Sequence, residues 1–388
     1  MYIRKNLMSI VILLTLTVSF LPRQIKNPIF FLIFALCVVR TIKEGNFNIR
    51  KKKGDISLGV TIISVLLLVY SVFNMIINGL SIDSLVRLFQ LFVSIFLLTA
   101  SANYDWNDKD IFLGKSICQI VIIISFAAWI VSGFSKNSFS AIFTHTGGLG
   151  GAMFVGVTFI MLRENKTLID KVLMVLAIIL AIVANSRTMI GGIIIFYVVY
   201  FLLGKIGTKK MKWLFDVVIL LVCFIPIAYM RIYESPLKDI FNEFSRTYFH
   251  KNFFSGRQHL WGTLTQLILN RPVIGYGLDV TPESLLGGTW SSHNWYLQVL
   301  LQMGIIGFVL LILLLRMIWR DLLLLNKRQT IISAGFLMGV LFWQCFEVSL
   351  TQNNFPSGIV VWLIFGIGLS EARKITPQNM NTSKQMNR

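Results

Sequence analysis

The segment DKVLMVLAIILAIVANSRTMIGGIIIFYVVYFLLG, residues 170–204, consists of two apolar blocks that nearly abut. Each block approaches the length of about 20 residues that crosses a lipid bilayer as an α-helix. Ser186, Arg187 and Thr188 stand between the blocks, so the segment predicts a helical hairpin whose turn lies at a membrane surface. Most of the remaining chain repeats the same kind of block.

Twelve such blocks follow one another along the 388 residues. We expect helices, because the lipid interior leaves a spanning segment no other way to satisfy its backbone polar groups. The chain is thus predicted to be an all-α integral membrane protein, one polytopic domain over residues 1–388 with about 12 transmembrane helices. The second block is short enough to be tilted or only partly inserted. The blocks are residues 7–22, 28–39, 57–78, 82–100, 111–132, 144–162, 170–185, 189–204, 213–230, 294–315, 331–350 and 355–370.

Composition excludes an ordinary soluble enzyme, since 55% of the residues are hydrophobic and 14% are charged, against about 25% charged in soluble domains. The formal net charge of +19 is not typical here of a nucleic-acid-binding protein. Its basic clusters lie in short connectors between apolar blocks, where the positive-inside rule places them. The bilayer is therefore the expected partner, and no nucleic acid is.

The distribution of Lys and Arg predicts the orientation. With both termini in the cytoplasm, 24 of these residues fall in cytoplasmic tails and loops and four fall in short outer loops. Long loops count little in this rule. The orientation places the long polar loop, residues 231–292, outside the cytoplasm, and the acidic connector of residues 105–110 inside. The polar tail, residues 371–388, is expected to be cytoplasmic and disordered.

The outer loop contains a predicted surface helix. Ser255 is a candidate N-cap for a helix that starts near Gly256. The apolar residues that follow recur at the spacing of one helical face, which favours a helix lying along the membrane surface. Ser291 or Ser292 is then expected to cap the next transmembrane helix. Two glycines that flank Tyr276 predict a turn between these helices.

Three residues are candidates for chemistry. Arg187 is costly at a membrane unless it faces a partner or a wet cavity, and its guanidinium fork suits phosphate; the alternative is an interfacial arginine that snorkels to headgroups. Arg257 opens the surface helix, and its alternative role is a solvated loop residue. His293 at a helix start is expected to be a neutral imidazole, as a general base requires; its alternative is a structural cap.

Other candidates have weaker contexts. His250 and His259 are alternatives to His293. Three aromatic residues, Tyr276, Trp290 and Trp295, suit stacking on sugar rings, although such residues also anchor membrane interfaces. No HExxH motif or Cys/His cluster is present, and the four cysteines lie in apolar blocks, so we expect no metal and no cofactor.

Taken together, these residues resemble the O-antigen ligase and polysaccharide polymerase family of bacterial envelope proteins over about residues 180–320. The order and spacing of the motifs carry the resemblance more than any one of them. The motifs are Ser186-Arg187-Thr188, Gly256-Arg257 with Trp261, Arg271-Pro272, Gly275-Tyr276-Gly277, and His293-Asn294-Trp295-Tyr296-Leu297 followed by Gly304-Ile305-Ile306-Gly307.

The resemblance implies a GT-C-like bundle that transfers glycans at the outer face of the bacterial cytoplasmic membrane. The donor would be an oligosaccharide on a polyprenyl diphosphate such as undecaprenyl diphosphate, with no metal or nucleotide sugar, and direct attack would invert the anomeric centre. Arg187 and Arg257 would bind the diphosphate, and His293 would act on the acceptor hydroxyl. The substrate-binding positions it implies also include Tyr276, Asn294 and Trp261.

The specific role stays open among three alternatives. We favour a polymerase that joins repeat units into a capsular, exo- or O-antigen-type polysaccharide, beside a flippase and a chain-length regulator as partners. The second alternative is a ligase that passes finished glycan to a lipid or protein acceptor. The third is a flippase or other transporter of lipid-linked oligosaccharide, but transporters usually place polar residues at the bilayer midplane, and this chain gathers them in one outer loop.

Overall fold

The computed structural model describes residues 58–135, 138–288, 291–352 and 355–374. These residues form thirteen α-helices and one short 3₁₀ helix, and they contain no strand. The helices are α3 Leu58–Asn78, α4 Ile82–Asn103, α5 Asp108–Val131, α6 Thr146–Leu162, α7 Leu168–Val183, α8 Arg187–Ile206, η2 Thr208–Met211, α9 Leu214–Tyr233, α10 Leu237–Phe249, α11 Arg257–Asn270, α12 Pro282–Leu286, α13 Trp295–Leu322, α14 Arg328–Trp343 and α15 Phe355–Arg373.

The predicted all-α class is confirmed for these residues, and ten of the twelve predicted blocks are helices. Six of the helical segments are long and apolar enough to cross a membrane, which makes the chain a polytopic integral membrane protein. The first two predicted blocks, residues 7–22 and 28–39, lie outside the described residues, as does the tail after residue 374.

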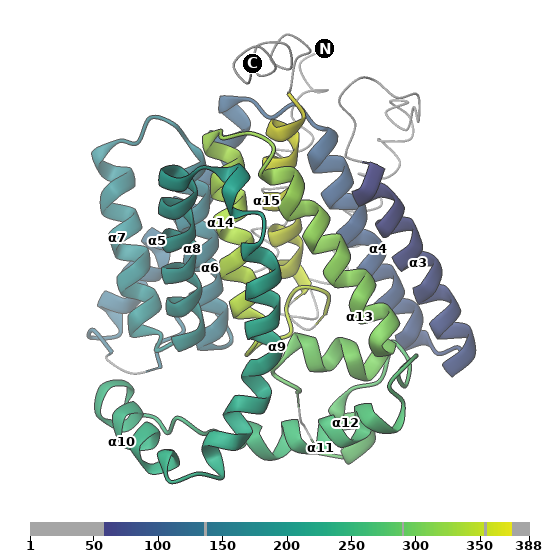
Figure 1. Ribbon diagram of the computed structural model, residues 1–388. Helices are drawn as coiled ribbons and strands as arrows, with labels where there is room; N and C mark the ends of the chain where they lie inside the picture. The colour runs from purple at the N-terminus through teal and green to yellow at the C-terminus, as the bar shows by residue number, and fades with distance from the viewer. Residues whose placement is uncertain (1–57, 136–137, 289–290, 353–354, 375–388) are drawn as a thin grey trace.

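The apolar helices stand side by side as a bundle, and α10, α11 and α12 lie across one end of it (Figure 1). Helix α14 packs against α8 and α15, α15 packs against α4, and α13 packs against α3. The helix interfaces are filled with large side chains that are fully buried, including Phe154, Phe196 and Phe336. The helix predicted in the long loop is confirmed as α11.

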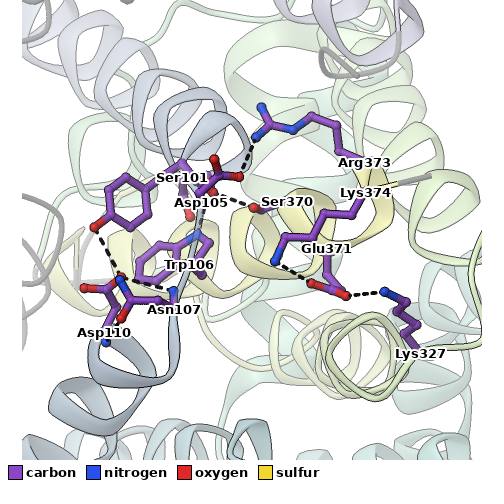
Figure 2. Close-up of polar contacts among 11 residues, drawn as sticks. Ser101, Asp105, Trp106, Asn107, Asp110, Lys327, Ser370, Glu371, Arg373 and Lys374 are labelled. Atoms are coloured by element: carbon purple, nitrogen blue, oxygen red, sulfur yellow. Dashed lines mark hydrogen bonds and ion pairs between the residues drawn. The ribbon is translucent and has the colours of Figure 1, made fainter. Parts of the chain in front are cut away.

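The opposite end of the bundle carries a set of polar contacts (Figure 2). The connector between α4 and α5 meets the end of α15 there, where Arg373 lies 3.5 Å from Asp105. Glu371 binds Lys327 at 2.8 Å and Lys374 at 3.0 Å. The acidic connector is thus partnered by basic residues of the same end, which accounts for acidic residues in a region otherwise rich in Lys and Arg.

Helix α13 is broken at Gly304, whose backbone (φ 59°, ψ −165°) is not helical. The break lets the turn after α11 approach closely, so that Tyr276 N–H donates to Leu301 O at 2.9 Å and Ile305 N–H donates to Pro272 O at 2.8 Å. These bonds satisfy backbone groups that the break frees from the helix. The part of α13 before Gly304 therefore lies at an angle to the part after it, at the end of the bundle where α10, α11 and α12 lie (Figure 1).

Three predicted boundaries are wrong. The N-cap of α11 is Gly256 in the left-handed region (φ 86°) and not Ser255, because the chain turns sharply there. Helix α13 is capped by Asn294, whose side chain accepts from Leu297 N–H at 2.9 Å, and not by Ser291 or Ser292. Helix α14 ends at Trp343, seven positions before the apolar block does, because the apolar residues beyond it form a packed loop.

The break at Gly304 gives a stability prediction. Gly304→Ala should destabilise the protein by about 3 kcal/mol, because the left-handed backbone disfavours a Cβ and the methyl group would meet the carbonyl of Val273. Gly204→Ala in α8 is the control, since nothing lies within 4 Å of its added methyl group. Thermal unfolding of both variants in detergent measures the difference, and an unchanged midpoint for Gly304→Ala would contradict the close approach.

Candidate active site

Arg187 is the first residue of α8, directly after the left-handed turn at Asn185 (φ 51°). The guanidinium donates from Nη1 to Ser245 Oγ at 2.7 Å and from Nη2 to Asn252 O at 3.3 Å. It also lies over the ring of Phe249, 6.0 Å from the centroid. The predicted hairpin is confirmed, and its arginine holds the α10–α11 connection against the end of the bundle.

That connection brings a second cation, Lys251, near Arg187. Ser245 Oγ donates to Lys251 O at 2.7 Å, and Asn185 Nδ2 donates to Phe249 O at 2.6 Å. Burial lowers the pKa of Lys251, and the charge of Arg187 lowers it further. Positive charge is therefore concentrated here, a setting that favours an anionic ligand.

Arg257 is the first residue of α11, and its charge lies within electrostatic range of Arg187. Its guanidinium lies 5.9 Å from the ring centroid of Phe346. Among the described residues it has no hydrogen bond or ion pair. A partly buried arginine without an ion pair is costly unless a ligand supplies the charge, so two arginines within electrostatic range of each other mark a candidate anion site.

Helix α11 is fixed by Trp261, which is fully buried. Its indole Nε1 donates to Ser292 O at 2.8 Å, and its ring packs on Tyr229 at 5.0 Å between centroids. Because Ser292 precedes His293, the same tryptophan ties the helix of Arg257 to the segment that carries the histidine. Trp261 thus has a visible positioning role, and its contribution to substrate binding stays a prediction.

His293 lies immediately before α13 with a left-handed backbone (φ 47°). Its Nδ1 is buried and has no hydrogen-bond partner among the described residues. Burial lowers the pKa of His293 to about 4, and the charges of Arg257 and His145 contribute to the decrease. The imidazole is neutral near pH 7 as expected, but the main cause is burial and not a helix dipole.

Asn294, which follows His293 in the sequence, also fixes the position of this segment. Besides capping α13, it donates from Nδ2 to Cys345 O at 3.0 Å, and Trp295 N–H donates to Gln344 O at 2.9 Å. The loop between α14 and α15 is therefore attached to the start of α13.

The remaining predicted residues take other places. Tyr276 donates its hydroxyl proton to Leu267 O at 3.1 Å and lies under Arg271, so it supports the turn after α11. Trp295 is buried and donates to Thr351 Oγ1 at 2.9 Å. His250 caps the end of α10, and His259 packs edge-on against Tyr233. Trp290 lies outside the described residues.

Sequence reasoning missed three charged or titratable residues at this end: Lys251, His145 and Glu347. His145 caps α6 through a bond from Gly148 N–H to its Nδ1 at 3.0 Å. Glu347 lies in the α14–α15 loop, within electrostatic range of Arg257. It sits inside a predicted apolar block, where a lone acidic residue gives no spacing signal. In the part of the chain that the structure describes, no group of three or more His, Cys, Asp or Glu is arranged to hold a metal.

Comparison with known families agrees with the resemblance. Residues 172–312 match the family model described as O-antigen ligase. The matched part contains Arg187, Arg257 and His293. A search of curated proteins found no match.

The proximity of Arg257 and His293 has a measurable consequence. Arg257→Gln should raise the pKa of His293 from about 4 toward the ordinary value of about 6.5, because a neighbouring positive charge disfavours the imidazolium. The pH dependence of diethylpyrocarbonate labelling of His293, followed by mass spectrometry, measures this pKa. Arg231→Gln is the control, since Arg231 is exposed and pairs with Glu234. A labelling midpoint that is the same in both variants would contradict the electrostatic coupling.

Proposed function

We propose that this protein is a polyprenyl-diphosphate-dependent glycosyltransferase that polymerises lipid-linked oligosaccharide repeat units into a surface polysaccharide. The observation that carries the proposal is the arrangement at one end of the bundle. Two arginines from different elements, one of them without a protein partner among the described residues, lie beside a neutral histidine. The O-antigen ligase match over the same residues supports a lipid-linked glycan as the donor.

The arginines suit the leaving group of such a reaction. As the bond between the anomeric carbon and the diphosphate oxygen breaks, the electron pair stays on the diphosphate and its negative charge grows. Preorganised donors stabilise charge that develops in a transition state, and arginine forks match phosphate oxygens. Arg187 and Arg257 are proposed to hold the diphosphate, with Lys251 adding positive charge nearby.

The histidine suits the other half of the reaction. A sugar hydroxyl is a weak nucleophile until its proton is removed, and a neutral imidazole accepts a proton. His293 is proposed to take the hydroxyl proton as the oxygen bonds to the anomeric carbon from the side opposite the diphosphate, which inverts that centre. The diphosphate between the arginines would offset the charge of Arg257, and the basicity of His293 would then rise when donor is bound.

The rest of the fold supports the same assignment. The apolar helices provide a surface for the polyprenyl tail, and the outer layer of α10, α11 and α12 covers the end of the bundle where the glycans would meet. The charge distribution of the loops supports an outward-facing site with both termini in the cytoplasm. A transporter would gather its polar residues nearer the bilayer centre, whereas here they gather at the α8, α11 and α13 starts.

Arg257→Ala and His293→Ala should each lower glycan transfer by about 100-fold or more, because each removes a group that acts mainly in the transition state. Arg257→Lys should recover only part of the activity, since lysine keeps the charge and loses the fork. Mass spectrometry of the polyprenyl-linked glycan pool measures the effect in cells that carry each variant.

The composition of the pool also identifies the type of transfer. Single repeat units that accumulate without polymer indicate a polymerase, and long lipid-linked polymer that lacks its final acceptor indicates a ligase. Arg231→Ala, at an exposed arginine paired with Glu234, should leave the pool unchanged. A normal pool in the Arg257 and His293 variants would contradict the glycosyltransferase proposal.

A further inference from the structure

The loop between α14 and α15 is held by several hydrogen bonds, and it reaches the candidate active site. The side chain of Gln344 bridges the two ends of a turn in this loop. Its Oε1 accepts from Ser349 N–H at 3.2 Å and Leu350 N–H at 3.1 Å, and its Nε2 donates to Ser349 Oγ at 3.0 Å. The backbone oxygens of Gln344 and Cys345 accept from the start of α13. The tip of this loop consists of Phe346 and Glu347.

Glu347 therefore has a fixed place between known parts of the site. On one side, its neighbour Phe346 lies under the guanidinium of Arg257, and two residues before it Cys345 binds Asn294 beside His293. On the other side, Oε1 of Glu347 lies 3.4 Å from the position of a Cβ on Gly147, near the start of α6. The carboxylate is partly buried and has no hydrogen bond or ion pair among the described residues.

An unpaired carboxylate in a partly buried place is unfavourable, and burial raises the pKa of Glu347 while the charge of Arg257 opposes the increase. Hydrogen bonds hold the loop that carries Glu347 in place, so loose packing of this loop does not account for the unpaired carboxylate. A group kept in that state is a candidate for ligand binding.

A second unpartnered group lies on the same face of α6. The indole Nε1 of Trp343 is buried without a hydrogen-bond partner in the described residues, and its ring lies 3.3 Å from the Cβ position of Gly151. Gly147 and Gly151 are four residues apart, so their Cβ positions point to one face of the helix. Glu347 and the ring of Trp343 thus both approach this face of α6, at Gly147 and at Gly151.

We propose that Glu347, together with Trp343 and the glycine face of α6, forms the subsite that binds hydroxyl groups of the acceptor sugar. This inference rests on the proposed glycosyl transfer and extends it to the second substrate. Both oxygens of a carboxylate accept from hydroxyl groups, and such charge-assisted bonds are about twice as strong as neutral ones. Arg257 lies within electrostatic range of both Glu347 and His293, so the carboxylate belongs to the same end of the bundle as the proposed base.

The test uses the full chain in lipid nanodiscs with two probes. The first is lipid-linked glycan extracted from cells that lack the protein, whose conversion gives kcat and KM. The second is undecaprenyl diphosphate alone, whose binding reports the arginine side of the site. Glu347→Gln should raise KM for the extracted glycan about tenfold or more, as expected for loss of a hydrogen bond to a charged group, with kcat and undecaprenyl diphosphate binding changed less than about twofold.

Gly147→Ala keeps both polar groups and favours the helix, but it adds a methyl group 3.4 Å from Oε1 of Glu347 and 3.2 Å from Nδ1 of His145. It should raise KM in the same way, so the inference stays testable if Glu347→Gln folds poorly. Glu283→Gln is the matched control, since Glu283 is an exposed carboxylate on α12 of the same outer layer.

The outcomes separate this inference from the proposed function. Unchanged KM in Glu347→Gln and Gly147→Ala would overturn the subsite. A loss of kcat at saturating glycan with KM unchanged would also overturn it, because Glu347 would then act in proton transfer and not in binding. If the wild-type protein does not convert the extracted glycan at all, the proposed function itself fails.

Discussion

The start of α13 is held by backbone hydrogen bonds on two sides, and the candidate active site depends on this attachment. On one side, the turn after α11 bonds to the broken helix around Gly304. On the other side, Trp295 N–H and the Asn294 side chain bind the α14–α15 loop. Such bonds are strongly favoured, because buried backbone groups without a partner are costly. They fix His293 relative to residues that are distant in the sequence.

The same attachment explains why charged groups without partners persist here. Arg257 belongs to helix α11, which the Trp261 indole links to Ser292 O by a hydrogen bond. Glu347 belongs to the α14–α15 loop, which hydrogen bonds to Gln344 Oε1 hold together. Each charged side chain is carried by an element whose other bonds are satisfied. The packing of those elements therefore offsets the cost of leaving the functional groups unpaired.

Electrostatics divides the site into two sides. Arg187, Lys251 and Arg257 make the side toward α8 and α10 positive, which suits a diphosphate. Glu347 provides negative charge on the side toward α6, which suits hydroxyl groups. His293 lies within electrostatic range of Arg257, and burial lowers its pKa, so it remains an uncharged base near the proposed diphosphate site. The division gives each substrate of a transfer reaction its own partners within one end of the bundle.

The sequence by itself determined the membrane class, the ten apolar helices among the described residues, the hairpin at Arg187 and the helix after Gly256, because apolar length and 3.6-residue periodicity act locally. Helices α10 and α12 were not predicted. Its motifs also pointed to Arg187, Arg257 and His293. The caps of α11 and α13 and the end of α14 were predicted wrongly, since close packing of the turn at Gly256 and of the loop after Trp343 sets them. Only the tertiary structure placed Glu347, His145 and Lys251 beside the predicted residues. Their neighbours lie in other helices, and no spacing along the chain records a contact between segments that a bundle brings together.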